Sequence, residues 1–288
     1  MKVLLTGATG QLGHALIRSA PATVELVALD RAALDLVQPE GLAALIEQHR
    51  PALLINAAAY TAVDRAEQEP ELAQRINAQA VAALAAACSA SAVRLMQIST
   101  DFVFDGRQSR PYRTEDQPAP LGVYGASKQA AEALLLASSQ LDWLIIRTAW
   151  VYASHGSNFV KTMLRLMAER DSLGVVADQI GTPTHAATLA RAVWAAAGQP
   201  ALRGIHHYTD AGVASWYDFA VAIMEEALAL GLLQRPLQIR PITTADYPTP
   251  ARRPAYSVLD KQASWAAFGF TPDHWRVELR TMLKELQR

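Results

Sequence analysis

Short apolar runs alternate with stretches of helical periodicity through the first 150 residues, and this alternation restricts the fold more than any other feature. Strands that are hydrophobic throughout are buried on both faces, and strands separated by helices pair in parallel. The sequence therefore predicts an α/β fold whose parallel sheet is covered by helices on both faces. The expected strands are residues 2–6, 24–30, 53–56, 93–99 and 143–147, and the expected helices end near residue 20 and span 39–49, 70–90 and 124–138.

A glycine-rich loop follows the first expected strand. Gly7, Gly10 and Gly13 are spaced three apart and lead into an amphipathic helix. Such glycines let the chain turn sharply, let the backbone approach a pyrophosphate and let the helix pack closely on the strand. Because N–H groups at a helix start attract phosphate, we expect a dinucleotide here, with a tight turn that binds nothing as the alternative.

Asp30 ends the second expected strand, where a carboxylate can accept hydrogen bonds from the adenosine ribose. It would repel a 2′-phosphate, which favours NADH, whereas the guanidinium of Arg31 can pair with that phosphate. We expect NADH to be preferred and NADPH to be accepted as well. The alternative is that Asp30 is only a turn residue.

Tyr124 and Lys128 are four residues apart, so on a helix they project from the same face. A nearby ammonium favours the phenolate, and we expect Lys128 to lower the pKa of Tyr124 from its ordinary value of about 10. Thr100, at the end of a strand, supplies a hydroxyl that can hold a carbonyl oxygen while Tyr124 protonates it. The alternatives are a half-buried tyrosine beside a solvated lysine and a hydroxyl that only caps the strand.

The second half of the chain alternates less regularly, which indicates a smaller α/β lobe built from C-terminal segments. We assign residues 1–157 to a dinucleotide-binding domain, with returning segments near 185–208 and 235–242. The substrate-binding lobe would then comprise residues 158–184, 209–234 and 243–288. Residues 102–122 are polar and hold three prolines, so we expect them to form a loop over the site.

Composition excludes several classes of partner. The 288 residues are 51% hydrophobic, and 26 basic against 27 acidic residues give a net charge of −1. We therefore expect neither a nucleic acid nor a membrane as partner. The single cysteine, Cys88, cannot form an internal disulfide and is expected to be a small core residue of a cytoplasmic protein.

Together, the glycine loop, Asp30, Thr100 and the Tyr124–Lys128 pair resemble the extended branch of the short-chain dehydrogenase/reductase superfamily, whose fold is a doubly wound sheet of Rossmann type. Several blocks are similar to the dTDP-4-dehydrorhamnose reductase family in particular. These blocks are residues 10–13, 56–64, 99–106, 147–152, 158–163, 178–184 and 247–254.

The resemblance implies transfer of a hydride from NADH or NADPH to the C4 ketone of dTDP-4-dehydro-L-rhamnose, which yields dTDP-L-rhamnose, a precursor of lipopolysaccharide or cell-wall polysaccharide. It implies that Tyr124 donates the proton, that Lys128 binds the nicotinamide ribose and that Thr100 orients the substrate.

The same resemblance implies further contacts of the cofactor and the substrate. Asp101 and Trp150 would join Thr100 in binding the substrate, with Trp150 packing on the sugar. Because two guanidinium groups beside Pro254 can meet a phosphate, we add Arg253 or its neighbour Arg252. The cofactor would contact Gly7, Gly10, Gln11, Leu12, Gly13, Asp30, Arg31, Asp35, Leu36, Ala59, Tyr60, Thr61, Ile98, Tyr124 and Lys128.

One departure from the family concerns metal and assembly. Some members form dimers bridged by a divalent ion that glutamates hold, and Ala15 and Ala187 stand at the matching places. Alanine cannot ligate a metal. We therefore expect no metal site and a monomer or weak homodimer without a magnesium bridge.

Two other functions remain open. Epimerases and dehydratases of nucleotide sugars belong to the same superfamily and retain a bound NAD⁺. The regulatory subunit of methionine adenosyltransferase resembles the family as well and works as a binding partner. The presence of Thr100, Tyr124 and Lys128 favours catalysis, and the similarity along the whole chain favours the reductase.

Overall fold

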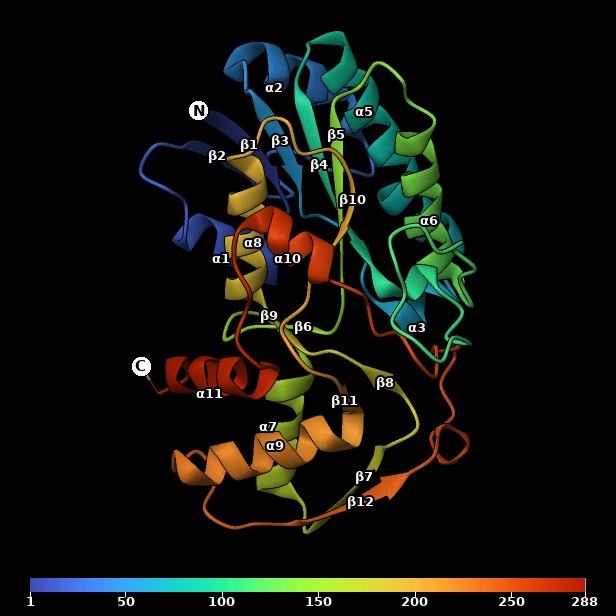
Figure 1. Ribbon diagram of the computed structural model, residues 1–288, viewed down its shortest axis with the longest axis vertical. Helices are drawn as coiled ribbons and strands as arrows, with labels where there is room; N and C mark the ends of the chain where they lie inside the picture. Colours follow the sequence, from blue (N-terminus) through green and yellow to red (C-terminus); the bar gives the residue numbers. More distant parts are fainter. Residues whose placement is uncertain (288) are drawn as a thin grey trace.

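A six-stranded, all-parallel sheet forms the larger part of the computed structural model, which describes residues 1–287 (Figure 1). Its strand order is β10-β5-β4-β3-β1-β2. The chain reverses its direction of winding between β1 and β3, and ligands bind at such switch points, beyond the carboxyl ends of the strands. The strands are β1 (Lys2–Thr6), β2 (Glu25–Leu29), β3 (Leu53–Asn56), β4 (Arg94–Thr100), β5 (Trp143–Thr148) and β10 (Gly204–His207).

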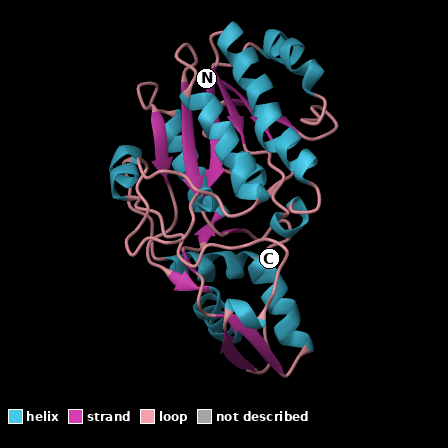
Figure 2. Ribbon diagram, turned by 90° about the vertical axis from the view of Figure 1, so that its right-hand side faces the viewer, coloured by secondary structure: helices cyan, strands magenta, loops and turns pink. Residues whose placement is uncertain are grey.

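Successive residues of each strand feed two cores on opposite faces of the sheet. In β1, Val3 and Leu5 belong to one hydrophobic cluster and Leu4 to the other. Figure 2 shows helices in front of the sheet and behind it. The first face is covered by α1 (Gln11–Arg18), α8 (Ala186–Ala197) and α10 (Gln262–Phe268), and the second by α2 (Leu42–His49), α5 (Ala80–Ala90) and α6 (Val123–Leu136). The predicted doubly wound α/β fold is confirmed.

A third core holds the smaller lobe together at the lower end of Figure 1. Three helices, α7 (Phe159–Glu169), α9 (Trp216–Ala229) and α11 (Trp275–Glu285), contribute to it together with β7 (Ser172–Val176). Two short strand pairs lie between this core and the large sheet. They join β6 (Val151–Tyr152) to β9 (Thr184–His185) and β8 (Ile180–Gly181) to β11 (Ala214–Ser215).

The segment 235–242 does not return to the large sheet, contrary to our expectation. Its strand β12 (Gln238–Ile242) pairs in parallel with β7 in the smaller lobe. Pro241 lacks a donor for a sheet ladder, and Gln238 and Arg240 are exposed. Such a strand suits the edge of a small sheet and cannot replace an apolar strand covered on both faces.

The helix expected over residues 70–90 is interrupted. It consists of α4 (Pro70–Gln74), one π-helical turn (Arg75–Gln79) and α5, and a short helix α3 (Val63–Ala66) precedes it. A π-turn inserts an extra residue and rotates the side chains that follow. The periodicity of an Ala-rich stretch carries no sign of such an insertion.

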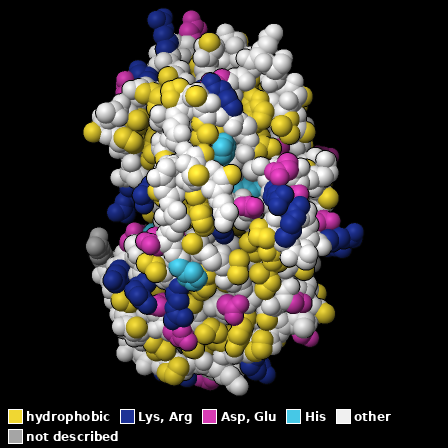
Figure 3. Space-filling model, in the orientation of Figure 1, with side chains coloured by type: hydrophobic (Ala, Val, Ile, Leu, Met, Phe, Trp, Pro, Cys, Tyr) yellow, Lys and Arg dark blue, Asp and Glu magenta, His cyan; other side chains and the backbone are white. Residues whose placement is uncertain are grey.

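The surface carries charges of both signs. They are interspersed over the face shown in Figure 3, in keeping with the net charge of −1. Among residues 1–287, no helix is both long enough and apolar enough to cross a membrane. Cys88 is fully buried in the core between α5 and the sheet, as predicted.

Candidate active site

A cleft of about 790 Å³ lies where the carboxyl ends of β1 to β5 meet the smaller lobe. Such a volume is typical of sites that hold small molecules and cofactors. Its walls come from both lobes, because residues that follow the strands line it together with Phe159, Trp216 and Phe219 of the smaller lobe.

The glycine loop forms one end of the cleft and depends on close backbone packing. A Cβ added at Gly13 would lie 2.1 Å from the carbonyl oxygen of Gly7, so only glycine lets α1 begin there. The first turn of α1 has no side-chain cap and no acidic residue. Its N–H groups and the positive end of the helix dipole are therefore available to an anion.

Asp30 and Arg31 lie beyond the end of β2, and both line the cleft. The Asp30 side chain accepts a hydrogen bond from Ala33 N at 2.9 Å. The Arg31 guanidinium is 77% exposed and lies 3.4 Å from Asp35 Oδ2. A carboxylate and an exposed guanidinium thus lie next to each other in the chain at the wall of the cleft, as the sequence indicated.

The other end of the cleft is formed by α6 and β4. Gly125 lets α6 approach the 3₁₀ turn that follows β4, since a Cβ there would lie 2.2 Å from the carbonyl oxygen of Phe102. Lys128 Nζ donates to the carbonyl oxygen of Ile98 at 2.6 Å. Tyr124, Lys128 and Thr100 consequently line the same cleft.

The electrostatics of Tyr124 differ from our expectation. Burial raises its pKa to about 12, the Thr100 hydroxyl lowers it only partly, and the charge of Asp101 raises it further. Burial also lowers the pKa of Lys128 to about 8, against the opposing effect of Glu132. The expected lowering of the Tyr124 pKa by Lys128 is therefore wrong for this structure, because Lys128 is not among the groups that shift this pKa and desolvation raises it.

Thr100 makes two hydrogen bonds at the end of β4. Its hydroxyl donates to Asp101 Oδ1 at 3.0 Å and accepts from Phe102 N at 3.2 Å. Asp101 is 1% exposed, and burial raises its pKa to about 6. Both side chains are held in place before any ligand binds.

The structure brings most of the predicted site residues to the cleft. Gly13 and Tyr60 are the exceptions, because Gly13 serves helix packing and the Tyr60 hydroxyl donates to Glu69 Oε2 at 2.7 Å. The predicted residues that line it are Gly7, Gly10, Gln11, Leu12, Asp30, Arg31, Asp35, Leu36, Ala59, Thr61, Ile98, Thr100, Asp101, Tyr124, Lys128, Trp150 and Arg253.

Residues 102–122 do not form a loop over the site, because only Phe102 of this stretch lines the cleft. After the 3₁₀ turn Asp101–Val103, the chain packs beside the sheet. Phe104 and Tyr112 stack at 4.2 Å and join Leu259 in a small core of their own. Because these aromatic rings are buried in that core, the segment lies outside the cleft.

An aromatic wall closes the cleft on the side of the smaller lobe. The indoles of Trp150 and Trp216 stack at 3.5 Å with 7° between their planes, and Phe159 packs on Trp216 at 4.7 Å. Gly181 lies against the same Trp150 indole, where a Cβ would be 2.5 Å from Cε2. Trp150, held at φ 47°, is thus packed between protein groups rather than offered with a free face to a sugar.

Arg253 reaches the cleft from the segment 247–254, one of the blocks similar to the family. Its guanidinium donates to both carboxylate oxygens of Asp64, at 3.0 and 2.7 Å, and to Thr249 Oγ1 at 2.6 Å. The neighbouring Arg252 is exposed and does not line the cleft. Asp64 therefore orients Arg253. The hydrogen bond from Arg253 is the main cause that lowers the pKa of Asp64.

Asn77 is a residue that sequence reasoning missed. It lies in the π-turn, is 1% exposed, and pairs with the backbone of Tyr60 through Tyr60 N (2.8 Å) and Tyr60 O (3.0 Å). It also donates to Ser127 Oγ at 2.9 Å, and Ser127 donates to Tyr124 O at 2.8 Å. The Asn77 side chain thereby links the loop after β3 to α6. The π-turn orients this side chain toward both of them.

Comparison with known proteins agrees with the class that this fold and cleft define, the extended short-chain dehydrogenase/reductases. Residues 1–288 match the family described as RmlD substrate binding domain. A dTDP-4-dehydrorhamnose reductase of Aggregatibacter actinomycetemcomitans is 43% identical over 98% of both chains. The chain belongs to the dTDP-4-dehydrorhamnose reductase family of oxidoreductases.

Two solved structures extend this likeness. The dTDP-4-dehydrorhamnose reductase of Clostridium acetobutylicum is 37% identical, with a TM-score of 0.93 over 100% of both chains. The enzyme of Bacillus anthracis, in complex with NADP, is 34% identical, with a TM-score of 0.91 over 99% of both chains.

Within the described residues 1–287, no group of three or more His, Cys, Asp or Glu side chains is arranged to hold a metal ion.

We predict that Asn77→Ala lowers the free energy of unfolding by about 2 kcal/mol, because buried backbone groups of Tyr60 lose their partner. Chemical denaturation measures this loss. Gln79→Ala, at an exposed position of the same π-turn, is the control and should change stability by less than about 0.5 kcal/mol. Equal effects of the two variants would contradict the assigned anchor role of Asn77.

Proposed function

We propose that this protein reduces the C4 ketone of dTDP-4-dehydro-L-rhamnose to dTDP-L-rhamnose with NADH or NADPH. The observation that carries the proposal is the shared cleft: the glycine loop lines one end of it, and Tyr124, Lys128 and Thr100 line the other. A dinucleotide held by the glycine loop would share the cleft with these three residues.

The residues at the glycine-loop end fit a nicotinamide dinucleotide. Close packing of Gly13 on Gly7 and the uncapped start of α1 suit a pyrophosphate, and Asp30 suits an adenosine ribose. When bound, the reduced nicotinamide supplies the hydride. The Lys128 ammonium, anchored on Ile98, would bind the adjoining ribose.

Tyr124 would supply the proton that balances the hydride. Its raised pKa keeps the phenol protonated at neutral pH, which is the form that a reduction requires. As negative charge develops on the ketone oxygen, the O–H bond breaks and the proton passes to that oxygen. Thr100 and Asp101 would hold the sugar beside it, because both side chains are fixed by their mutual hydrogen bond.

Arg253 would meet the diphosphate of the substrate. Asp64 and Thr249 already hold its guanidinium at the cleft wall, so little side-chain freedom is lost on binding. The aromatic wall of Trp150, Trp216 and Phe159 would present edges and apolar surface to the nucleotide sugar.

The direct test is oxidation of NADH and NADPH by the purified protein with the dTDP-4-keto-L-sugar, followed by absorbance and by analysis of the product. We expect that one molecule of the reduced cofactor is oxidised for each molecule of dTDP-L-rhamnose formed. Turnover of the sugar without net oxidation would indicate an epimerase or dehydratase instead, and binding without turnover would indicate a regulatory subunit.

We predict that Tyr124→Phe lowers kcat by about a hundredfold or more, because the proton donor is lost while the ring that packs on Phe102 is kept. Fluorescence titration should show nearly unchanged NADPH affinity. Full activity of this variant would rule out Tyr124 as the donor.

The pH dependence of kcat follows from Lys128. Its ammonium form is required and its pKa is about 8, so activity is present below this pH and falls as the pH rises through it. Tyr124, with a pKa of about 12, stays protonated across this range. A profile of kcat measured from pH 6 to pH 10 checks this, and we call its fall above pH 8 the alkaline limb. A profile that stays flat through pH 8 would be inconsistent with the role of Lys128.

Cofactor choice is expected to depend on Asp30 and Arg31. Asp30→Ser removes the carboxylate that repels a 2′-phosphate and should raise the ratio of kcat/KM for NADPH to that for NADH about tenfold. Arg31→Ala should lower the same ratio. If neither variant changes it, these two residues do not read the adenosine ribose.

A further inference from the structure

A buried ion pair lies directly beside the proposed catalytic residues. Arg147 on β5 and Glu132 on α6 have side chains that are 1% and 2% exposed, and Nη2 lies 2.6 Å from Oε2. Arg147 Nε also donates to both carboxylate oxygens, at 2.9 and 3.1 Å. Because desolvation makes a buried pair a weak source of stability, its position behind the cleft calls for another explanation.

Glu132 contacts both elements that carry the catalytic side chains. It follows Lys128 by four residues on α6 and therefore lies on the same face of the helix. Its Oε1 accepts a hydrogen bond from Ser99 Oγ at 2.5 Å, and Ser99 is the neighbour of Thr100 on β4. One carboxylate thus fixes the helix that holds Lys128 against the strand that ends in Thr100.

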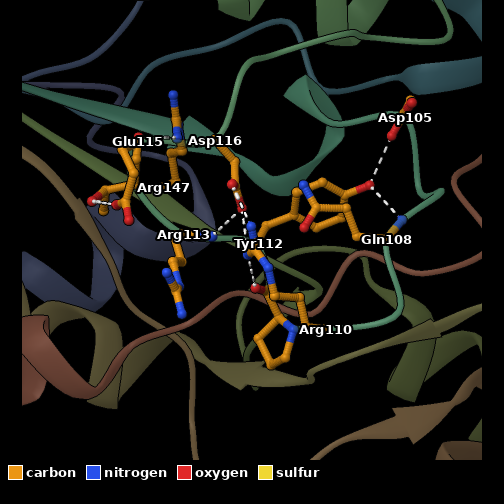
Figure 4. Close-up of polar contacts among 10 residues, drawn as sticks. Asp105, Gln108, Arg110, Tyr112, Arg113, Glu115, Asp116 and Arg147 are labelled. Atoms are coloured by element: carbon orange, nitrogen blue, oxygen red, sulfur yellow. Dashed lines mark hydrogen bonds and ion pairs between the residues drawn. The ribbon is translucent and has the colours of Figure 1, made fainter.

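Arg147 extends this frame to the segment that joins β4 to α6. Its Nη1 donates to the carbonyl oxygen of Thr114 at 3.3 Å, and its guanidinium lies 5.0 Å from the centre of the Phe104 ring. Figure 4 shows Arg147 beside the segment 105–116, whose own cross-links include Tyr112 to Asp105 (2.8 Å). The connection between Thr100 and Tyr124 is therefore held at its middle.

The charges around the pair define its electrical effect. The titratable groups nearest to the pair are Lys128 and Tyr124 on α6, Asp101 after β4 and His207 on β10. His207 is neutral at pH 7, because burial and the charge of Arg147 lower its pKa to about 3. Its Nε2 accepts from Arg147 Nη1 at 3.3 Å while Nδ1 donates to Asp260 O at 3.1 Å.

We propose that the Glu132–Arg147 pair is a positioning device for the reduction: Glu132 places a carboxylate one helical turn from buried Lys128, and Arg147 holds that carboxylate in line. This inference rests on the proposed function. It assigns to Glu132 and Arg147 no contact with substrate or cofactor, and neither lines the cleft. Burial pulls the pKa of Lys128 down, and Glu132 is the charge that opposes this.

The test is the alkaline limb of the pH profile of kcat in Glu132→Gln, which keeps the shape of the side chain. Loss of the negative charge should move this limb to lower pH by about one unit, while NADPH affinity at pH 6.5, measured by fluorescence, stays nearly unchanged. An alkaline limb left in place in the folded variant would overturn the proposal.

Glu226→Gln is the matched control. Glu226 is a second buried glutamate, 4% exposed, paired with Arg276 and Arg280 in the smaller lobe. Its neutralisation should weaken the fold in a similar way without moving the limb. An equal shift in this control would show that loss of stability, rather than the charge beside Lys128, causes the effect.

A double variant covers the case in which Glu132→Gln fails to fold around an unpaired Arg147. Glu132→Gln with Arg147→Met leaves no lone charge in the core. The alkaline limb of the kcat profile should move to lower pH by a smaller amount than in Glu132→Gln. An alkaline limb that stays in place would again overturn the proposal. A wild-type protein without reductase activity would instead refute the proposed function, and this inference with it.

Discussion

The contact between α6 and the end of β4 determines the geometry of the whole cleft. It requires Gly125, because any side chain there would meet the carbonyl oxygen of Phe102. The closeness of the two elements lets Lys128 reach back to the carbonyl oxygen of Ile98, and it places Tyr124 at the same wall as Thr100. The buried Glu132–Arg147 pair and the Ser99 hydroxyl lie behind these groups and join the helix to the strand.

The two lobes contribute different kinds of surface to this cleft. The sheet edge offers backbone donors, carboxylates and the Tyr124–Lys128 pair, which suit a charged cofactor and proton transfer. The smaller lobe offers stacked aromatic rings and apolar walls. Arg253 is held by Asp64 where these surfaces meet, so the position suited to an anionic group is prepared before a ligand arrives. A nucleotide sugar combines these same chemical features.

Much of the fold and of the site was predictable, because the signals were local. The apolar run of β1, the glycines after it and the spacing of Tyr124 and Lys128 each depend on neighbours in the chain, and the structure brings them to one cleft. The misses depend on tertiary packing. The burial that raises the pKa of Tyr124, the second ring that covers Trp150 and the π-turn that aims Asn77 are set by distant residues. The misplacement of β12 is the one error that the sequence could have prevented, because Pro241 and its polar neighbours are typical of an edge strand.

In the proposed reaction, a hydride passes from the nicotinamide to a sugar ketone within this cleft while Tyr124 supplies the proton. The most direct measurement is the fate of deuterium from NADPH labelled at C4 of the nicotinamide, followed by mass spectrometry and NMR of the sugar product. The account predicts one deuterium at C4 of the L-rhamnosyl ring, delivered from a single face of the nicotinamide. Product that forms without deuterium at C4 from both of the C4-labelled epimers of NADPH would contradict it.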